Sequence, residues 1–242
     1  MRLRREPPPL RPATVCRTHA LTPRMVRVTF EVEGFTVEQP AASVRLLLPS
    51  PGTDELVVPA WNGNEFLLPD GRRPILRTFT PRRADGTTLD VDIVLHGSGV
   101  ASQWAASAQP GARAAVSGPG RGYEVDPDAP AFLLGGDETA IPAISQLLDV
   151  LPPTTPRQVL IEAPPDARQP LDATWLDTAL ADAVRDVDIA PGTRIWMAGE
   201  AAEVQRIRKH LFNERGIPRR DASVRGYWKR GRSGDDDDAT AT

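Results

Sequence analysis

The pattern of strand and helix signals changes once along the chain, and this change constrains the fold more than any other feature. Before residue 120 the sequence predicts short strands and one helix, whereas after residue 130 strands alternate with helices. The first pattern is typical of an antiparallel barrel and the second of a parallel sheet covered on both faces. We therefore predict two domains, 1–126 and 127–232, with the boundary at the linker-like run DPDAP.

Six short runs rich in β-branched and apolar residues make up the predicted first domain. Gly, Pro, Asp or Ser bounds each run, and a helix at 101–108 interrupts the set. These features predict a six-stranded antiparallel β-barrel. The expected strands are 26–32, 43–49, 55–61, 76–83, 88–97 and 112–119.

The second predicted domain alternates strands with helices. Such a pattern predicts a parallel α/β sheet, whose strands end at one edge where nucleotides bind. The last helix should stop at Gly216 and Pro218, which disfavour a continuing helix. We expect strands at 132–135, 159–163 and 194–200, and helices at 141–151, 174–184 and 201–215.

Composition narrows the class of protein. The chain is 40% hydrophobic and has a single cysteine, Cys16, so we expect a globular core, no internal disulfide and a cytoplasmic location. No apolar run approaches the roughly 20 residues of a membrane span, so neither membrane insertion nor secretion is expected. Without the aspartates at 235–238 the net charge of -3 becomes +1, which does not suggest nucleic-acid binding. Residues 233–242 should form a disordered acidic tail.

The run RTFT, at 77–80, lies within a predicted strand. Side chains alternate along a strand, so Arg77 and Phe79 should share a face. A flavin nucleotide needs a cation for its pyrophosphate and a flat apolar partner for its ring. The alternative is an ordinary surface arginine beside a core phenylalanine.

The run HGSGVASQW, at 96–104, joins a predicted strand to a helix. Gly97 and Gly99 leave backbone N–H groups at the positive end of the helix dipole, and Ser102 adds a hydroxyl, so the turn can receive phosphate. The alternative is a plain turn. We expect His96 to be a hydrogen-bonded structural residue and predict no metal site, because no other ligand lies at suitable spacing from it.

The run GGDETAIPAI, at 135–144, turns from strand to helix at a typical nucleotide-binding position, although GxGxxG is absent. Asp137 and Glu138 are unusual beside a polyanion and can instead cap the helix. Thr139 is a candidate polar contact for ribose or phosphate.

Other strand ends should line the same nucleotide cleft, namely Glu162 and Glu200. Glu162 can hold ribose hydroxyls, which favours NADH, whereas Arg168 or Arg194 can accept the extra phosphate of NADPH. The sequence leaves both alternatives open.

The run GYWKRGR, at 226–232, is basic and aromatic and follows the last predicted helix. It is either a terminal arm or a solvated tail. As an arm, it would place Tyr227 or Trp228 near a cofactor ring, and Lys229 and Arg230 toward an anionic substrate. One short basic cluster on a nearly neutral chain does not indicate a nucleic-acid binding surface.

Taken together, these runs resemble the siderophore-interacting protein family, and the resemblance covers residues 26–232. The matching runs, in the family's order, are RTFT, VLHG followed by ASQWA, PGARAAVSGPGRGY, LLGGDETAIPAI, WMAGEAAEVQRIRKHL and VRGYWKRGR. The resemblance implies a ferredoxin reductase-like fold and FAD-dependent reduction of a ferric siderophore, with electrons from NADPH, NADH or a ferredoxin. It makes 1–126 the FAD-binding domain and 127–232 the NAD(P)H-binding domain.

The resemblance also implies roles for individual residues, and no catalytic acid or base is among them. Phe79 stands where the family usually has tyrosine, and Val100 where many relatives have proline. The implied FAD contacts are Arg77, Thr78, Phe79, Thr80, His96, Gly97, Ala101 and Ser102. Asp137 and Thr139 fall on the nicotinamide-nucleotide side, and Arg45, Lys229 and Arg230 on the basic cluster for the ferric complex.

Two other functions remain open on the sequence. One is an NAD(P)H-dependent flavin reductase that supplies a protein partner, and the other is a non-catalytic ferric-siderophore binding protein. In each case we expect a monomer.

Overall fold

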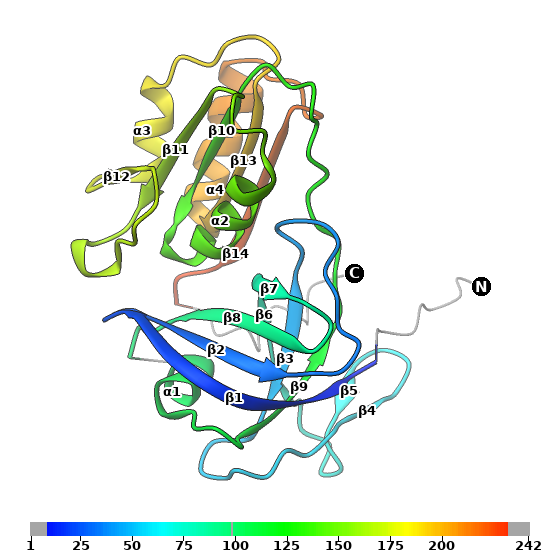
Figure 1. Cartoon of the computed structure of the whole chain (residues 1–242). Helices are drawn as coiled ribbons and strands as arrows, with labels where there is room; N and C mark the ends of the chain where they lie inside the picture. Colours follow the sequence, from blue (N-terminus) through cyan, green and yellow to red (C-terminus); the bar gives the residue numbers. More distant parts are fainter. Residues whose placement is uncertain (1–8, 98, 232–242) are drawn as a thin grey trace. The chain divides into compact units, whose positions relative to one another are not determined.

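The structure is a computed structural model that describes residues 9–97 and 99–231. The chain divides into two compact units (Figure 1). The first contains the described chain up to Leu21 together with Met25–Gly122, and the second contains Thr22–Arg24 and the described chain from Tyr123 onward.

The first unit is built around a seven-stranded antiparallel sheet with the order β6-β3-β9-β1-β2-β8-β7. A separate hairpin pairs β4 (Ala60–Trp61) with β5 (Phe66–Leu67), and helix α1 (Val100–Ser107) follows β8. The strands of the sheet are β1 (Arg11–Thr22), β2 (Met25–Glu31), β3 (Val44–Leu48), β6 (Ile75–Phe79), β7 (Pro81–Ala84), β8 (Thr88–Val94) and β9 (Arg113–Ser117).

The two outer strands of this sheet, β6 and β7, are consecutive in the sequence and separated only by Thr80. Adjacent Cα atoms are about 3.8 Å apart, so this link keeps the two edges of the sheet together. The sheet therefore curls into a barrel that is not closed by hydrogen bonds, because β6 and β7 stay at the two ends of the strand order. Inside it, alternate side chains such as Val28, Phe30 and Leu46 form the core, and the Phe30 ring stacks on Trp104 of α1.

The first unit differs from the sequence prediction in four places, one of which is the short strand β5, which was not predicted. We did not predict β1, in which Ala13 and Val15 are the only fully buried residues. The expected strand at 55–61 is reduced to β4, because Val57 and Val58 are exposed to solvent. The expected strand at 76–83 is split at Thr80, where Pro81 has no N–H to continue a ladder.

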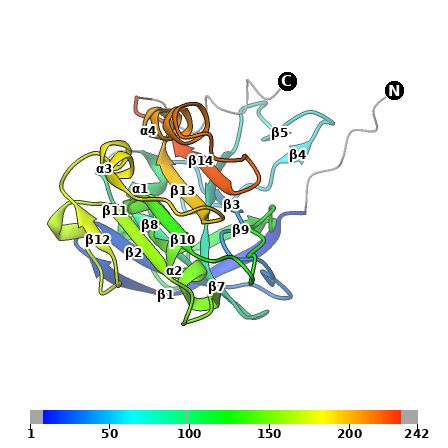
Figure 2. The same ribbon diagram turned by 90° about the horizontal axis from the view of Figure 1, so that it is seen from above.

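The second unit is a five-stranded parallel sheet with the order β12-β11-β10-β13-β14. Helices α3 (Leu180–Asp186) and α4 (Ala201–Arg208) cover one face, and α2 (Ile141–Val150) covers the other (Figure 2). A π-helical segment, η3 (Lys209–Glu214), continues α4, and two 3₁₀ turns, η1 (Glu138–Ala140) and η2 (Pro165–Ala167), follow β10 and β11. The strands are β10 (Phe132–Asp137), β11 (Arg157–Glu162), β12 (Thr174–Leu176), β13 (Arg194–Glu200) and β14 (Ala222–Trp228).

The parallel sheet confirms the predicted α/β class but adds two edge strands. Residues 174–176, expected to begin a helix, form β12 and pair with Leu160–Glu162. Residues 226–228, expected to lie in a terminal arm, are the last residues of β14. The predicted disordered tail at 233–242 lies outside the described residues. In the described part of the chain, no helix combines the length and the apolar character that crossing a membrane requires.

Candidate functional site

Strand β6 carries the run RTFT at one edge of the barrel sheet. Its register with β3 sets Arg77 opposite Leu46, and Phe79 opposite Val44. Arg77 and Phe79 therefore share a face, as the alternation predicts, and Phe79 is half-buried against the barrel core. The Arg77 guanidinium donates to the carbonyl of Leu76 at 3.0 Å.

The other face of β6 brings together two residues predicted for different roles. Thr78 lies directly opposite Arg45 of β3, and both side chains are exposed. A predicted cofactor residue and a predicted substrate residue are thus cross-strand neighbours. Thr80, in contrast, is buried between β6 and β7.

The turn before α1 has the backbone that the glycine-rich run requires. Gly97 and Gly99 have φ of 72° and 82°, values that favour glycine. The Ser102 hydroxyl accepts a hydrogen bond from the backbone N–H of His96 at 3.0 Å, and so holds the turn closed. Ala101 packs on the barrel core.

Among the described residues, no side chain caps the N-terminus of α1, although the His96 imidazole lies close to Gly99. Its first residue, Val100, follows Gly99, which provides no side-chain cap, and the first turn contains no acidic residue. A Cβ built on Gly97 would have no neighbour within 4 Å. These N–H groups at the positive end of the helix dipole fit a phosphate of FAD.

In the second unit, Asp137 ends the central strand β10 and its carboxylate accepts four hydrogen bonds. Oδ1 accepts from the N–H of Thr139 at 2.9 Å and from its hydroxyl at 2.5 Å. Oδ2 accepts from the N–H of Glu200 at 2.9 Å and from Nε1 of Trp228 at 2.7 Å. Burial raises the pKa of Asp137, although these donors oppose the rise. The capping role suggested for Asp137 is confirmed at η1, and the Thr139 hydroxyl is engaged in it. Glu138 does not share that role, because its carboxylate pairs with Arg24.

Two other strands of this sheet also end in carboxylates that bind backbone N–H groups. Oε2 of Glu200 accepts from Ala202 at 2.6 Å and Glu203 at 3.2 Å, which caps α4, and Oε1 accepts from Arg230 at 3.1 Å. These bonds lower the pKa of Glu200, with the Arg230 N–H as the largest cause.

Glu162 and the arginines suggested for NADPH take different places. Oε2 of Glu162 accepts from the N–H of Leu180 at 2.8 Å, at the start of α3, and the suggested ribose contact of Glu162 stays a prediction. Arg194 begins β13 and pairs with Asp126 and Asp221. Arg194 and Glu200 are six positions apart at opposite ends of β13, about 20 Å along a strand, so Arg194 lies at the other edge of the sheet from the one where a nucleotide is expected.

Arg168, in contrast, follows β11 at its carboxyl end. Its guanidinium donates to the carbonyl of Ala163 at 3.4 Å and to Asp177 at 2.5 Å. Asp177 is largely exposed. Arg168 therefore stays a candidate for the extra phosphate of NADPH.

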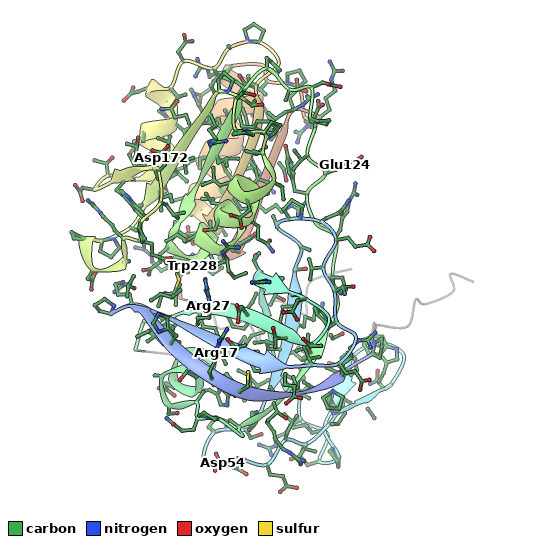
Figure 3. The ribbon with its side chains drawn as sticks, viewed as in Figure 1. Arg17, Arg27, Asp54, Glu124, Asp172 and Trp228 are labelled. Atoms are coloured by element: carbon green, nitrogen blue, oxygen red, sulfur yellow. The ribbon has the colours of Figure 1, made fainter. Side chains whose placement is uncertain are left out.

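The two aromatic residues that precede the basic pair lie in different environments. Tyr227 packs edge-to-face on the buried Trp196, with ring centroids 6.3 Å apart. Trp228, labelled in Figure 3, ends β14. It is 40% exposed. Lys229 and Arg230 follow it and are exposed.

Sequence reasoning missed the bonds that hold this segment. Trp228 and Asp137 are 91 positions apart, so no local spacing indicates their hydrogen bond. Arg45 belongs to the first unit and Lys229 and Arg230 to the second, so their grouping as one cluster stays a prediction. Across residues 9–97 and 99–231, no three His, Cys, Asp or Glu side chains gather in a way that would hold a metal ion.

Comparison with known families gives two matches, one for each unit. Residues 14–123 match the siderophore-interacting FAD-binding domain, and residues 129–231 match the siderophore-interacting protein domain.

Two curated proteins resemble the chain over nearly its full length. The uncharacterized protein Rv2895c of Mycobacterium tuberculosis is 36% identical over 93% of this chain and 92% of its own length. The ferric vibriobactin reductase ViuB of Vibrio cholerae is 29% identical over 90% of this chain and 88% of its own.

Solved structures show the same architecture. A siderophore utilization protein from T. fusca aligns with a TM-score of 0.82 and 34% identity, covering 94% of this chain and 95% of its own. A ferredoxin NADP+ reductase from Neisseria gonorrhoeae, with FAD and NADP bound, aligns with a TM-score of 0.67 over 90% and 99%, but at 12% identity. The fold is therefore ferredoxin reductase-like.

Proposed function

The chain belongs to the siderophore-interacting protein family, and from this premise we propose that it is an FAD-dependent ferric-siderophore reductase. The observation that carries the proposal is the match of both units to the two domains of this family. ViuB, a ferric reductase by name, adds support because its similarity runs through both units.

We assign FAD to the first unit, on the residues that resemble the family's flavin site. The Arg77 guanidinium would bind the pyrophosphate, and Phe79, on the same face, would pack against the ring system. The N–H groups at the start of α1, which follow His96 and Gly97 and have no side-chain cap, would receive phosphate oxygens. Thr78 and Thr80 would contact the flavin along β6, and Ala101 and Ser102 would shape the phosphate and adenine loop.

We assign NADPH or NADH to the carboxyl edge of the parallel sheet. Asp137 and Thr139 are the proposed contacts, and their mutual hydrogen bonds fix the turn η1 at that edge. When bound, FAD converts the two-electron donation of a nicotinamide into the single electrons that Fe(III) accepts. A ferredoxin is the alternative electron donor.

We assign the ferric siderophore to the basic residues Arg45, Lys229 and Arg230. Their exposed cations would attract an anionic complex, and the attraction should weaken as salt screens it. Siderophores hold Fe(III) through hard oxygen ligands, and Fe(II) is less charged and softer. Reduction itself would therefore loosen the iron.

The assignment can be tested on the purified protein. We expect the absorbance of bound FAD, and ferrous iron captured by a chelator when NADPH, NADH or reduced ferredoxin is supplied with a ferric siderophore. A protein that takes up no FAD would contradict the proposal. Turnover that does not change when ferric complexes are added would instead favour a flavin reductase that supplies a protein partner. Binding of a ferric siderophore by a protein without flavin would favour a non-catalytic carrier.

The basic pair can be tested by substitution. Changing Lys229→Ala and Arg230→Ala together should raise the KM for an anionic ferric siderophore severalfold, because attraction at the site is lost, and should leave the FAD content unchanged. The control, Arg72→Ala with Arg73→Ala, removes the same charge from an exposed loop of the first unit. Equal KM values in the two double variants would remove Lys229 and Arg230 from the site.

We further propose a monomer that acts in the cytoplasm. Mass measurement in solution tests the first statement, and fractionation of cells tests the second.

A further inference from the structure

The segment Trp228–Arg230 is exposed, yet hydrogen bonds hold it at both ends. The Trp228 indole donates to Asp137, and the backbone N–H of Arg230 donates to Glu200. Packing alone does not account for this order, because Trp228 is 40% exposed and the next two side chains are exposed as well.

The indole reaches Asp137 across an intervening strand. The order β10-β13-β14 places β13 between the strand that ends in Asp137 and the strand that ends in Trp228. Gly199, near the end of β13, leaves the room for this bond. A Cβ at Gly199 would lie 2.8 Å from Oδ2 of Asp137, and its φ of 158° also disfavours a side chain.

A β-bulge sets the direction of Trp228. In the ladder between β13 and β14, Gly199 pairs with Gly226 but Glu200 pairs with Trp228, which leaves Tyr227 as the extra residue. An extra residue reverses the face on which the following side chains lie. The bulge thus places Trp228, instead of Tyr227, opposite Glu200 at the end of β13.

Glu200 links Asp137 to the far end of the exposed segment. Its own N–H donates to Asp137, and its carboxylate accepts from the N–H of Arg230. Oε2 is meanwhile fixed by the first turn of α4. Asp137 and Glu200 therefore connect the ends of β10 and β13 to the exposed segment, which begins at the end of β14.

From these contacts we propose that Asp137 and Glu200 are positioning residues, which hold Trp228–Arg230 in one conformation and so preset the cations of Lys229 and Arg230. Only the identity of the ligand, an anionic ferric siderophore, rests on the proposed function. A segment held before binding loses less conformational freedom when the ligand arrives, which favours affinity.

The first test measures amide hydrogen exchange of the full chain, with no ferric complex present. In Asp137→Asn, one carboxylate oxygen becomes an amide NH₂ that faces donors, and in Trp228→Phe only the indole donor is lost. Both should speed exchange in peptides that cover 226–231 by at least about tenfold, since a hydrogen bond to a charged group is lost. Glu162→Gln is the matched control, because Glu162 also ends a strand of this sheet but binds Leu180.

Unchanged exchange in both variants would overturn the proposal. Trp228→Phe keeps the test decisive if Asp137→Asn fails to fold, because residue 228 is exposed and the ring remains.

The second test separates KM from kcat. Trp228→Phe should raise the KM for the ferric siderophore several-fold and leave kcat within about twofold, as expected when binding rather than chemistry is weakened. A fall in kcat alone would contradict the positioning role. If the wild-type protein reduces no ferric complex, the proposed function fails, but hydrogen exchange still decides whether Asp137 holds the segment.

Discussion

Polar side chains on the face of β2 and β8 that points away from the barrel core form cross-strand pairs that local sequence does not indicate. Arg27 of β2, labelled in Figure 3, lies opposite Asp92 of β8. Two N–H groups of its guanidinium bind the Asp92 carboxylate at 2.6 and 2.8 Å. In the next cross-strand pair, the Thr29 hydroxyl donates a hydrogen bond to Oδ1 of Asp90 at 2.5 Å. The sequence DVDIV predicts the strand, but the partners follow from its register with β2.

The Asp92 carboxylate is almost fully buried, so its loss should be costly. We expect Asp92→Ala to lower the free energy of unfolding by about 1–3 kcal/mol, because Arg27 is left without its partner. Urea unfolding measures the change. Asp70→Ala, which removes the exposed partner of Arg72, should leave stability unchanged within error. Equal losses in the two variants would contradict this account.

Whole strands and helices were predictable where apolar residues recur at regular spacing. Elements without such a pattern were missed. β2, β8 and β13 have runs of buried residues and were found. β1 buries two residues fully, and β14 one, so neither has a clear apolar signal. Such edge or half-exposed strands are fixed by pairing with neighbours, which the sequence of one segment does not contain.

The junction of β10 and η1 is crowded around Gly136. A Cβ there would lie 2.6 Å from the carbonyl oxygen of Ala198 and would overlap the side chain of Ala140. Gly136→Ala should therefore lower the free energy of unfolding by about 1–3 kcal/mol, as overpacking does. Gly226→Ala is the control, since its nearest neighbour would be at 3.6 Å. Thermal unfolding of both variants checks the difference, and an equally stable Gly136→Ala would refute it.

The cap of α4 should make stability depend on pH. The pKa of Glu200 is lower in the folded chain, so its anion stabilises the fold above the ordinary glutamate pKa of about 4.3, and this contribution is lost as pH falls through the folded value. We expect Glu200→Ala to cost about 1 kcal/mol near neutral pH. The difference from wild type should shrink below pH 4. A difference that does not vary with pH would rule out the charge as its cause.

The motifs of the two units follow one another along the chain in the order that the family shows. This order is why the family and the fold could be predicted from the sequence. The glycine turn at 97–99 and the cap at Asp137 were also predictable, because each is local. The hydrogen bond from Trp228 to Asp137 was not, since it depends on the strand order and on a bulge.

Each proposed cofactor should protect a different unit. Added FAD should slow hydrogen exchange at 75–80 and 96–102, and NADPH at 135–140 and 198–201, because a ligand stabilises the state that binds it. At a free concentration of 100 times Kd the gain is about 2.7 kcal/mol. Riboflavin, which lacks the phosphates, should protect the turn at 96–102 less than FAD. Protection by FAD in the second unit would refute the assignment of domains.

The single residue between β6 and β7 limits how this chain can change length. One inserted residue beside Thr80 would turn every following side chain of β7 to the opposite surface, Pro81 among them. The run 50–59 contains no strand residue, so it can lengthen or shorten without such a slip. Natural variants of this protein should therefore gain and lose residues at 50–59 and keep a constant spacing from Phe79 to Pro81.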